Sequence, residues 1–146
     1  MSKRFDVGEA VKALVSRAVP NSKVIGMEPD EARPTTVGEL GLVIVRSGDP
    51  GSPDIDLSPP VYWYDHTFPI ELAAVRDGAR TARQVLDDML TAIGGEIEAD
   101  RSLGGLCTYL AGEAPIDGET QTNGAAAISW ADAAIIATYS TTSPLG

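Results

Sequence analysis

The chain has 146 residues, of which 43% are apolar and 22% charged, which is the size of one domain with a single core. With 21 acidic against 11 basic residues its net charge is −10, which disfavours non-specific binding to nucleic-acid phosphates. Its one cysteine excludes an internal disulfide and a four-thiolate zinc site, and no apolar stretch has the length of a signal-peptide core or a membrane span. These features predict a soluble, non-exported chain that forms one domain over residues 1–146.

The N-terminal segment predicts a helix. Asp6 can cap it, with Glu9 three residues later in a capping box, and Pro20 ends it. Apolar residues then recur at helical spacing, which indicates a stripe that faces the core: Val7, Val11, Leu14, Val15 and Ala18.

Short strands and long loops are predicted next. The β-branched runs at 23–27 and 39–48 indicate strands. Proline, glycine and charged residues predict long loops at about 28–38, 47–60 and 112–124. We expect the 47–60 loop to be mobile in an isolated subunit, because little in it can pack on the core.

The stretch DHTFPIELAAV at 65–75 predicts a half-buried strand. Phe68, Ile70 and alternate residues after them share one side of an extended chain. Pro69 cannot donate a ladder hydrogen bond, so the strand is predicted to lie at an edge or to bulge there. His66 is interpreted as a polar residue at the strand end, beside the aromatic run YWY, because its neighbour Asp65 points to the opposite face and cannot orient it as a base.

The clearest helical pattern covers residues 79–101. Its polar face carries Arg80, Arg83, Asp87 and Asp88, in which Arg83 and Asp87 can pair one turn apart. Gly94-Gly95 favours a kink or early fraying of the helix. The apolar stripe consists of Ala79, Ala82, Val85, Leu86, Met89, Leu90, Ile93 and Ile97.

Two extended runs follow this helix, LCTYLAGEAPID and AAAISWADAAIIATYST, and a loop at 118–124 joins them. The second run is apolar on much of both faces, which places it centrally in a sheet. The order of elements predicts an α+β fold, with a mainly antiparallel sheet of about four to five strands packed by one long helix and the N-terminal helix.

No motif for a nucleophile elbow, a phosphate loop, a dinucleotide fold or a zinc helix is present. Cys107 lies between leucines and is interpreted as a small buried residue. The acidic loop residues Asp49, Asp54 and Asp56 could collect a hard cation but lack the spacing of a calcium-binding hand, so we interpret them as solvated. The sequence therefore predicts no enzyme, no catalytic residue, no cofactor and no metal site.

Four segments together resemble a known family: HTFPIELAAV, the helix ARQVLDDMLTAIGGEIEADRSLGGL, YLAGEAPIDGE, and the closing ATYSTTSPLG. Their succession is similar to that of the tail terminator (minor tail, or tail-completion) proteins of long-tailed bacteriophages and phage-like gene transfer agents, and it covers roughly residues 66–146. The resemblance rests on patterns of strand, helix and turn and not on invariant reactive residues. It implies no catalytic residues that could be carried over to this chain.

The resemblance implies a structural virion protein in the tail–neck region, assembled in the host cytoplasm. It implies a hexameric ring that binds the last ring of the tail tube protein, ends tube polymerisation and joins the head-completion or stopper protein. Genome DNA would pass through the lumen without specific binding, which agrees with a charge of about −60 for six copies at −10 each, and no membrane is involved.

The candidate contacts with other subunits or partners are chosen from the expected exposure, charge and aromatic character of the residues themselves. These are Arg80, Arg83, Asp87 and Asp88 on the helix, Pro34 and Asp54 in the loops, and Tyr62 and Trp63 in the aromatic run. The aromatic pair could equally cap the end of the core. Two alternatives stay open, another neck component such as a head–tail adaptor or stopper, and a small acidic enzyme or ligand-binding domain with a pocket around Asp54, Asp56 and His66.

Overall fold

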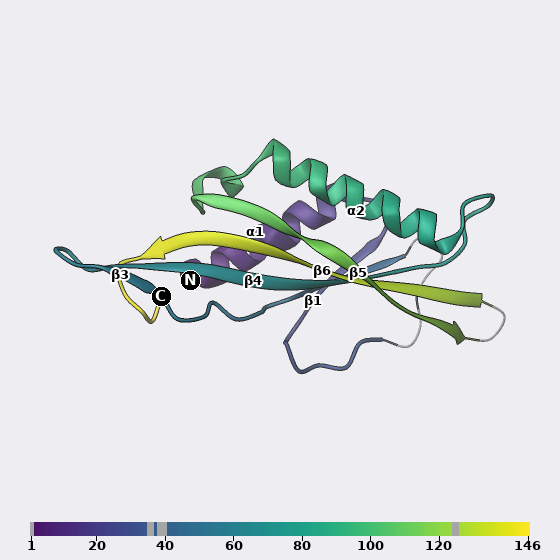
Figure 1. Cartoon of the computed structure of the whole chain (residues 1–146), viewed down its shortest axis with the longest axis horizontal. Helices are drawn as coiled ribbons and strands as arrows, with labels where there is room; N and C mark the ends of the chain where they lie inside the picture. The colour runs from purple at the N-terminus through teal and green to yellow at the C-terminus, as the bar shows by residue number, and fades with distance from the viewer. Residues whose placement is uncertain (1, 35–36, 38–40, 124–125) are drawn as a thin grey trace.

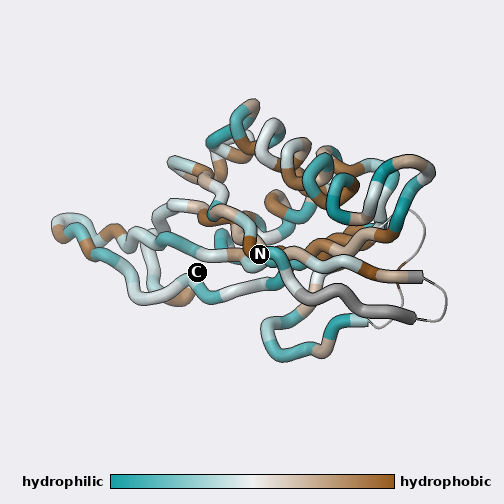
Figure 2. The backbone as a smooth tube through the Cα atoms, turned by 45° about the vertical axis from the view of Figure 1, so that its right-hand side comes forward, coloured by the Kyte–Doolittle hydropathy of each residue, from teal (hydrophilic) through white to brown (hydrophobic). Residues whose placement is uncertain are grey.

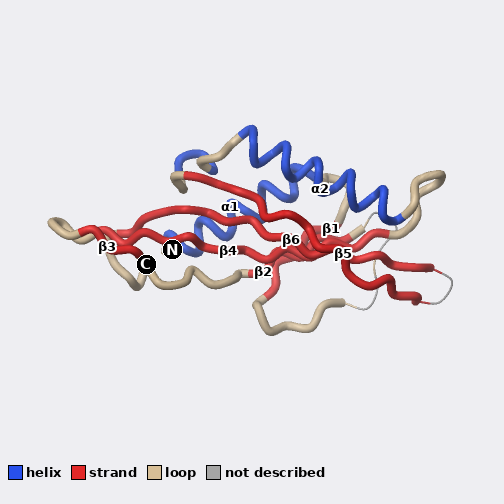
Figure 3. Tube along the Cα trace, in the orientation of Figure 1, coloured by secondary structure: helices blue, strands red, loops and turns tan. Residues whose placement is uncertain are grey.

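The computed structural model describes residues 2–34, 37, 41–123 and 126–146, and its two helices lie on one face of a mixed six-stranded sheet (Figure 1; Figure 3). The strand order is β1-β2-β4-β6-β5, with β3 beside β4; β1 and β2 are parallel and the other pairs antiparallel. The predicted α+β class is confirmed, but the sheet has more strands than predicted and includes a parallel pair. The elements are α1 Lys3–Ala18, β1 Lys23–Met27, β2 Leu42–Arg46, β3 Asp54–Asp56, β4 Val61–Ala74, α2 Ala82–Ala99, the short 3₁₀ helix η1 Leu103–Gly105, β5 Tyr109–Asn123 and β6 Ala126–Thr141.

Helix α1 begins one turn earlier than its sequence pattern predicts. Ser2 is the N-cap, and its hydroxyl accepts a hydrogen bond from the backbone N–H of Phe5 at 3.3 Å. The prediction of Asp6 as the cap is wrong, because Asp6 lies in the first turn, where its charge still favours the helix dipole. The predicted stripe is confirmed by its buried members Val7, Val11, Leu14 and Val15.

Helix α2 begins at a capping box, in which Thr81 accepts from the backbone N–H of Gln84 and the Gln84 side chain accepts from the N–H of Thr81. The helix runs on without a break through Gly94 and Gly95 to Ala99, so the early fraying that the two glycines favour does not occur. Its buried residues Leu86, Met89, Ile93 and Ile97 pack with α1 against the sheet. Figure 2 shows this core as apolar segments gathered where helices and sheet meet. Among the described residues, neither helix is both long and apolar enough to cross a membrane.

Strand β4 has a neighbouring strand on both sides only near its two ends, so at Pro69 its second side is an edge, as predicted. It pairs with β6 from Tyr62 to Ala74, and on its other side with β2 near one end and β3 near the other. Pro69 is tolerated because its ring lies toward Gly48, where β2 has already ended and no ladder bond is needed. Gly48 has a φ of +66°, and a Cβ there would lie 1.9 Å from the carbonyl oxygen of Thr67, so only glycine fits.

The predicted loop at 112–124 is mostly strand. β5 continues to Asn123 against β6, with irregular register between Glu113 and Ile116 and between Asp117 and Thr120. Proline and glycine in this stretch indicate a loop from sequence, but here they fall in or beside these irregularities. Residues 124–125, the first of which belongs to the predicted loop, lie outside the described residues.

The connection from β1 to β2 is held against the helix-free face of the sheet by Arg46. This side chain is 7% exposed as a residue, contacts Glu71 at 2.5 Å, and donates to the carbonyl oxygens of Glu28 and Glu31 at 2.8 and 2.5 Å. A buried guanidinium with both a carboxylate partner and carbonyl acceptors is a satisfied charge. Arg46 therefore fixes the part of the 28–38 loop that the structure describes at Glu28 and Glu31.

A second, smaller core lies on this helix-free face. Trp130 is its largest residue, and the guanidinium of Arg33 stacks over the indole ring at 4.1 Å from the centroid. Arg33 also pairs with Glu71 at 3.4 Å. The candidate residue Pro34 follows Arg33 directly in the sequence and is half-buried.

Candidate interaction surface

A narrow projection leaves the body at the end where the chain termini lie, and we call its residues, Asp54–Trp63, the arm (Figure 1). It consists of β3, the turn LSPP and the first residues of β4, with Asp54 opposite Trp63 and Ile55 opposite Tyr62. The arm extends past the helices, so nothing in the two-layer body covers it (Figure 3). The predicted 47–60 loop thus contains a strand, because its residues pair with β4 instead of packing on the core.

The arm carries exposed apolar side chains on an ordered frame. Ile55 is 54% and Leu57 78% exposed. The indole N–H of Trp63 donates to the Asp56 carboxylate at 3.0 Å, which ties the two strands together. Tyr62 is half-buried against the main core, so of the two readings of the aromatic pair, capping of the core applies to Tyr62. Asp54 is exposed, as predicted for a candidate contact.

Further exposed apolar residues lie at the same end of the molecule. Phe5 on α1 is 47% and Leu145 in the C-terminal tail 93% exposed. The tail is held at the base of the arm, since the Tyr64 hydroxyl donates to the carbonyl oxygen of Pro144 at 3.3 Å. Large exposed apolar groups gathered in this way are typical of surfaces that bind a partner.

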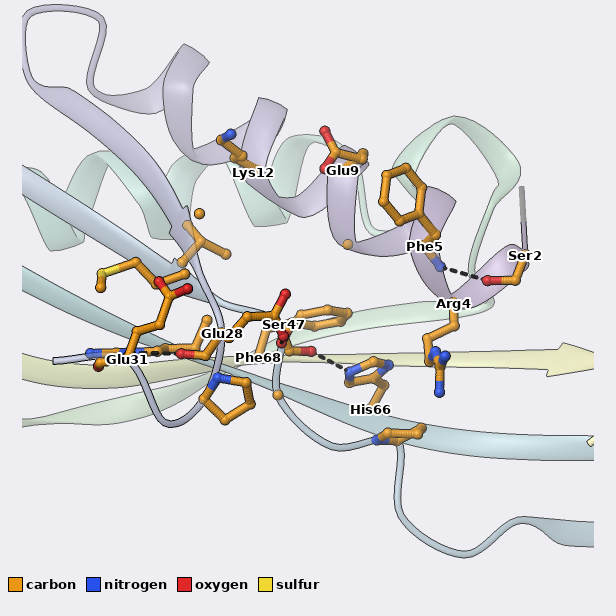
Figure 4. A pocket seen from close by; sticks show the side chains of 18 residues that line it. Ser2, Arg4, Phe5, Glu9, Lys12, Glu28, Glu31, Ser47, His66 and Phe68 are labelled. Carbon is orange, nitrogen blue, oxygen red and sulfur yellow. Dashed lines mark hydrogen bonds between the residues drawn. The ribbon is translucent and has the colours of Figure 1, made fainter. Parts of the chain in front are cut away.

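A cleft of about 810 Å³ opens between α1, the end of β2 and the loop after it (Figure 4). Its apolar wall includes Phe68 and Val45, and Phe5 stands at its rim. Arg4 extends into one end of the cleft beside His66, whereas Glu31 lies at the opposite end. The cleft is therefore partly apolar, with a cation at the end nearest the termini.

His66 lies at the floor of this cleft and is 1% exposed, in the middle of β4 rather than at the strand end. Its Nε2–H donates to the carbonyl oxygen of Ser47 at 2.8 Å, and its Nδ1 accepts from the Tyr139 hydroxyl at 2.9 Å. Burial lowers the pKa of His66 below 6.5, against the opposing effect of the Ser47 hydrogen bond. Both ring nitrogens are engaged in holding the structure, and Asp65 bonds Thr138 on the opposite face, as the strand geometry predicts.

The polar residues at the start of α2 pair within the chain. Arg80 binds Asp77 and Asp88, both at 2.6 Å, and Arg83 binds Asp117 of β5 at 2.9 Å; we call these five residues the α2 charge cluster. The predicted pair of Arg83 with Asp87 is replaced by this contact, because β5 brings a carboxylate closer. Asp87 is exposed on the same helix face.

The remaining candidates for chemistry do not converge. Cys107 is buried, and burial raises its pKa, which keeps it a thiol. Asp49 accepts from the backbone N–H of Gly51, and Asp54 and Asp56 lie on β3, away from the cleft lined by His66. Within the part of the chain that the structure describes, no group of three or more His, Cys, Asp or Glu side chains could hold a metal ion.

Sequence reasoning found Asp54, Tyr62 and Trp63 of the arm but missed its apolar residues. Ile55 and Leu57 alternate with aspartates in the stretch DIDL, a two-residue period that is a strand signal even inside a proline-rich segment. It also missed Arg4 and Phe5, which precede the predicted start of the N-terminal helix and lie in the first turn of α1.

Comparison with protein-family models and with the sequences of curated proteins gives no match.

Proposed function

We propose that this protein is a structural subunit of a phage-type tail, a tail terminator that forms a ring at the head-proximal end of the tube. In this role it ends polymerisation of the tail tube protein and joins the tail to the head-completion or stopper protein. The observation that carries the proposal is the arm, an ordered projection with Ile55 54% and Leu57 78% exposed. Exposed apolar groups on a rigid frame lose little conformational freedom when a neighbouring subunit covers them.

The charge of the chain supports the same role. A ring through which genome DNA slides must not hold phosphates, and a net charge of −10 per subunit repels them. The engagement of His66 and the burial of Cys107 leave their side chains occupied in the fold. These features favour an assembly role over a small acidic enzyme built on Asp54, Asp56 and His66.

The experiment is to produce particles without this protein and to measure tails by electron microscopy. A terminator predicts tubes of irregular, excessive length that stay unjoined to filled heads, and restored tails when the wild-type protein is supplied. Tails of normal length beside tailless heads would instead indicate a head–tail adaptor or stopper. Complete, infectious particles would contradict any role in the neck.

A further inference from the structure

The arm and the cleft have complementary chemistry. Residues 47–75 contain five carboxylates and no lysine or arginine, and the arm itself presents Asp54 and Asp56 beside its two exposed apolar side chains. In the cleft, Arg4 and Lys12 make no ion pair with any described residue, although the chain has only 11 basic residues and pairs five of its arginines elsewhere. An acidic projection with exposed apolar side chains thus extends outward from a molecule whose unpaired cations Arg4 and Lys12 line a partly apolar cleft.

None of the three glutamates that line the cleft pairs with Arg4, so Arg4 can bind an acidic group of another molecule. Glu31 lies at the far end, Glu9 lies on the following turns of α1, and Glu28 accepts from the Ser47 hydroxyl at 3.3 Å (Figure 4). Near Arg4 the lining includes Ser2, Phe5 and His66. The cleft volume of about 810 Å³ is large enough for the side chains of two aliphatic residues and the turn that carries them.

β3 and the start of β4 run outward from the body (Figure 1), and the cleft is lined by no residue of the arm. A second copy of this chain can supply the arm. We propose that the arm of one copy docks in the Arg4 end of the cleft of the next, with Leu57 and Ile55 against Phe5 and with Asp54 beside Arg4.

This contact is heterologous, because the arm of one copy meets a different surface, the cleft, of the next copy, so copies join head to tail and can close a ring. The charges orient the arm, and the apolar contacts hold it. The inference deepens the proposed function by naming the contact between subunits, but it stands or falls on self-association of the pure protein, whereas the virion role is tested on particles.

The test uses the full-length protein and two variants, the arm variant Ile55→Ser/Leu57→Ser and the cleft variant Arg4→Glu, followed by sedimentation velocity. Each variant alone should associate at least about tenfold more weakly than wild type. Mixed in equal amounts, they should form a heterodimer and stop there, because only the arm of the cleft variant and the cleft of the arm variant are both intact. Lys23→Glu is the matched control, since it reverses an exposed cation outside the cleft, and it should assemble as wild type does.

A second variant is needed in case the cleft variant Arg4→Glu folds poorly, and it reverses the charge on the arm as well. Adding Asp54→Arg to Arg4→Glu restores opposite charges and should recover at least about tenfold of the lost association. A monomeric wild-type protein, a mixture that stays monomeric, or a mixture that forms species larger than a dimer would each overturn arm-in-cleft docking. If docking holds and particles lacking the protein are nevertheless complete, the self-association stands and the tail role fails.

Discussion

The two ends of the molecule present different kinds of surface. The arm exposes large apolar groups whose contacts within the chain are few, whereas the α2 charge cluster at the opposite end satisfies its charges with one another (Figure 1). Exposed ion pairs that are complete within one subunit gain little from a neighbour, because a new partner must replace an existing one. For this reason we place the proposed contact between copies at the surface where packing is incomplete, and not at the surface with the most charges.

The largest effect is expected from the arm. Ile55→Ser with Leu57→Ser should lower the association constant between copies by about a hundredfold, because both side chains lie at the centre of the proposed contact. The free energy of unfolding of the monomer should change by less than about 0.5 kcal/mol, since both positions are exposed. Analytical ultracentrifugation and thermal denaturation measure the two quantities.

Ile116→Ser is the control for this variant. Ile116 is 72% exposed, but it lies on β5 away from the arm. Equal loss of association in both variants would mean that general surface hydrophobicity, and not the arm, drives assembly.

A smaller effect is expected from the frame of the arm. Trp63→Phe keeps an aromatic ring but removes the N–H that donates to Asp56 at 3.0 Å. The loss of one hydrogen bond to a carboxylate should loosen the arm and weaken association by about fivefold, equivalent to about 1 kcal/mol. Hydrogen exchange at Asp54–Asp56 should become faster in the variant monomer, and unchanged exchange with unchanged association would show that the bond has no part in shaping the arm.

His66 should make stability depend on pH at the base of the arm. The folded state holds His66 neutral with a pKa below 6.5, whereas the unfolded chain protonates near that value. The unfolded state therefore binds more protons, so the free energy of unfolding should fall as pH drops below about 6.5, toward the lower pKa of the folded state.

His66→Gln is the comparison for this dependence. Denaturant unfolding of the variant between pH 7 and pH 5 should show a shallower slope, whereas its assembly at pH 7 should persist. The same slope in both proteins would mean that other groups cause the pH dependence.

The smallest effect is expected from the α2 charge cluster. Arg80→Glu with Arg83→Glu breaks contacts within the chain, while the buried stripe of the helix is untouched. Association should change by less than about twofold at low and moderate salt. If this variant lost as much association as the arm variant, the contact between copies would lie at the α2 charge cluster and not at the arm.

Periodic burial was predictable from the sequence, and contacts between distant segments were not. The stripes of both helices and the alternation in β4 follow from local spacing, as Val11 and Ile70 illustrate. The parallel pairing of β1 with β2, and the hydrogen bonds by which Arg46 holds the connection between them, join residues that no local pattern relates. Likewise, β3 becomes a strand only because β4 offers it an edge, so its prolines and aspartates predicted a loop.

The site was predictable to a similar degree. Asp54 and Trp63 were named from composition, but the exposure of Leu57 depends on how far the arm extends beyond the helices. The pairing of Arg83 with Asp117 joins residues 34 positions apart, so the sequence favoured the nearer Asp87. Candidate interface residues on α2 were thus chosen for their charge before their partners within the chain were known.

The mass of the wild-type protein in solution tests the central claim most directly, namely that copies join through incomplete surfaces at the arm end. Native mass spectrometry of the purified chain should show a closed assembly, with a mass about six times the 15.3 kDa of one chain if the ring is hexameric. The same measurement on Ile55→Ser/Leu57→Ser should show the single chain. A wild-type protein that stays at 15.3 kDa, or an arm variant that keeps the wild-type assembly, would contradict the account.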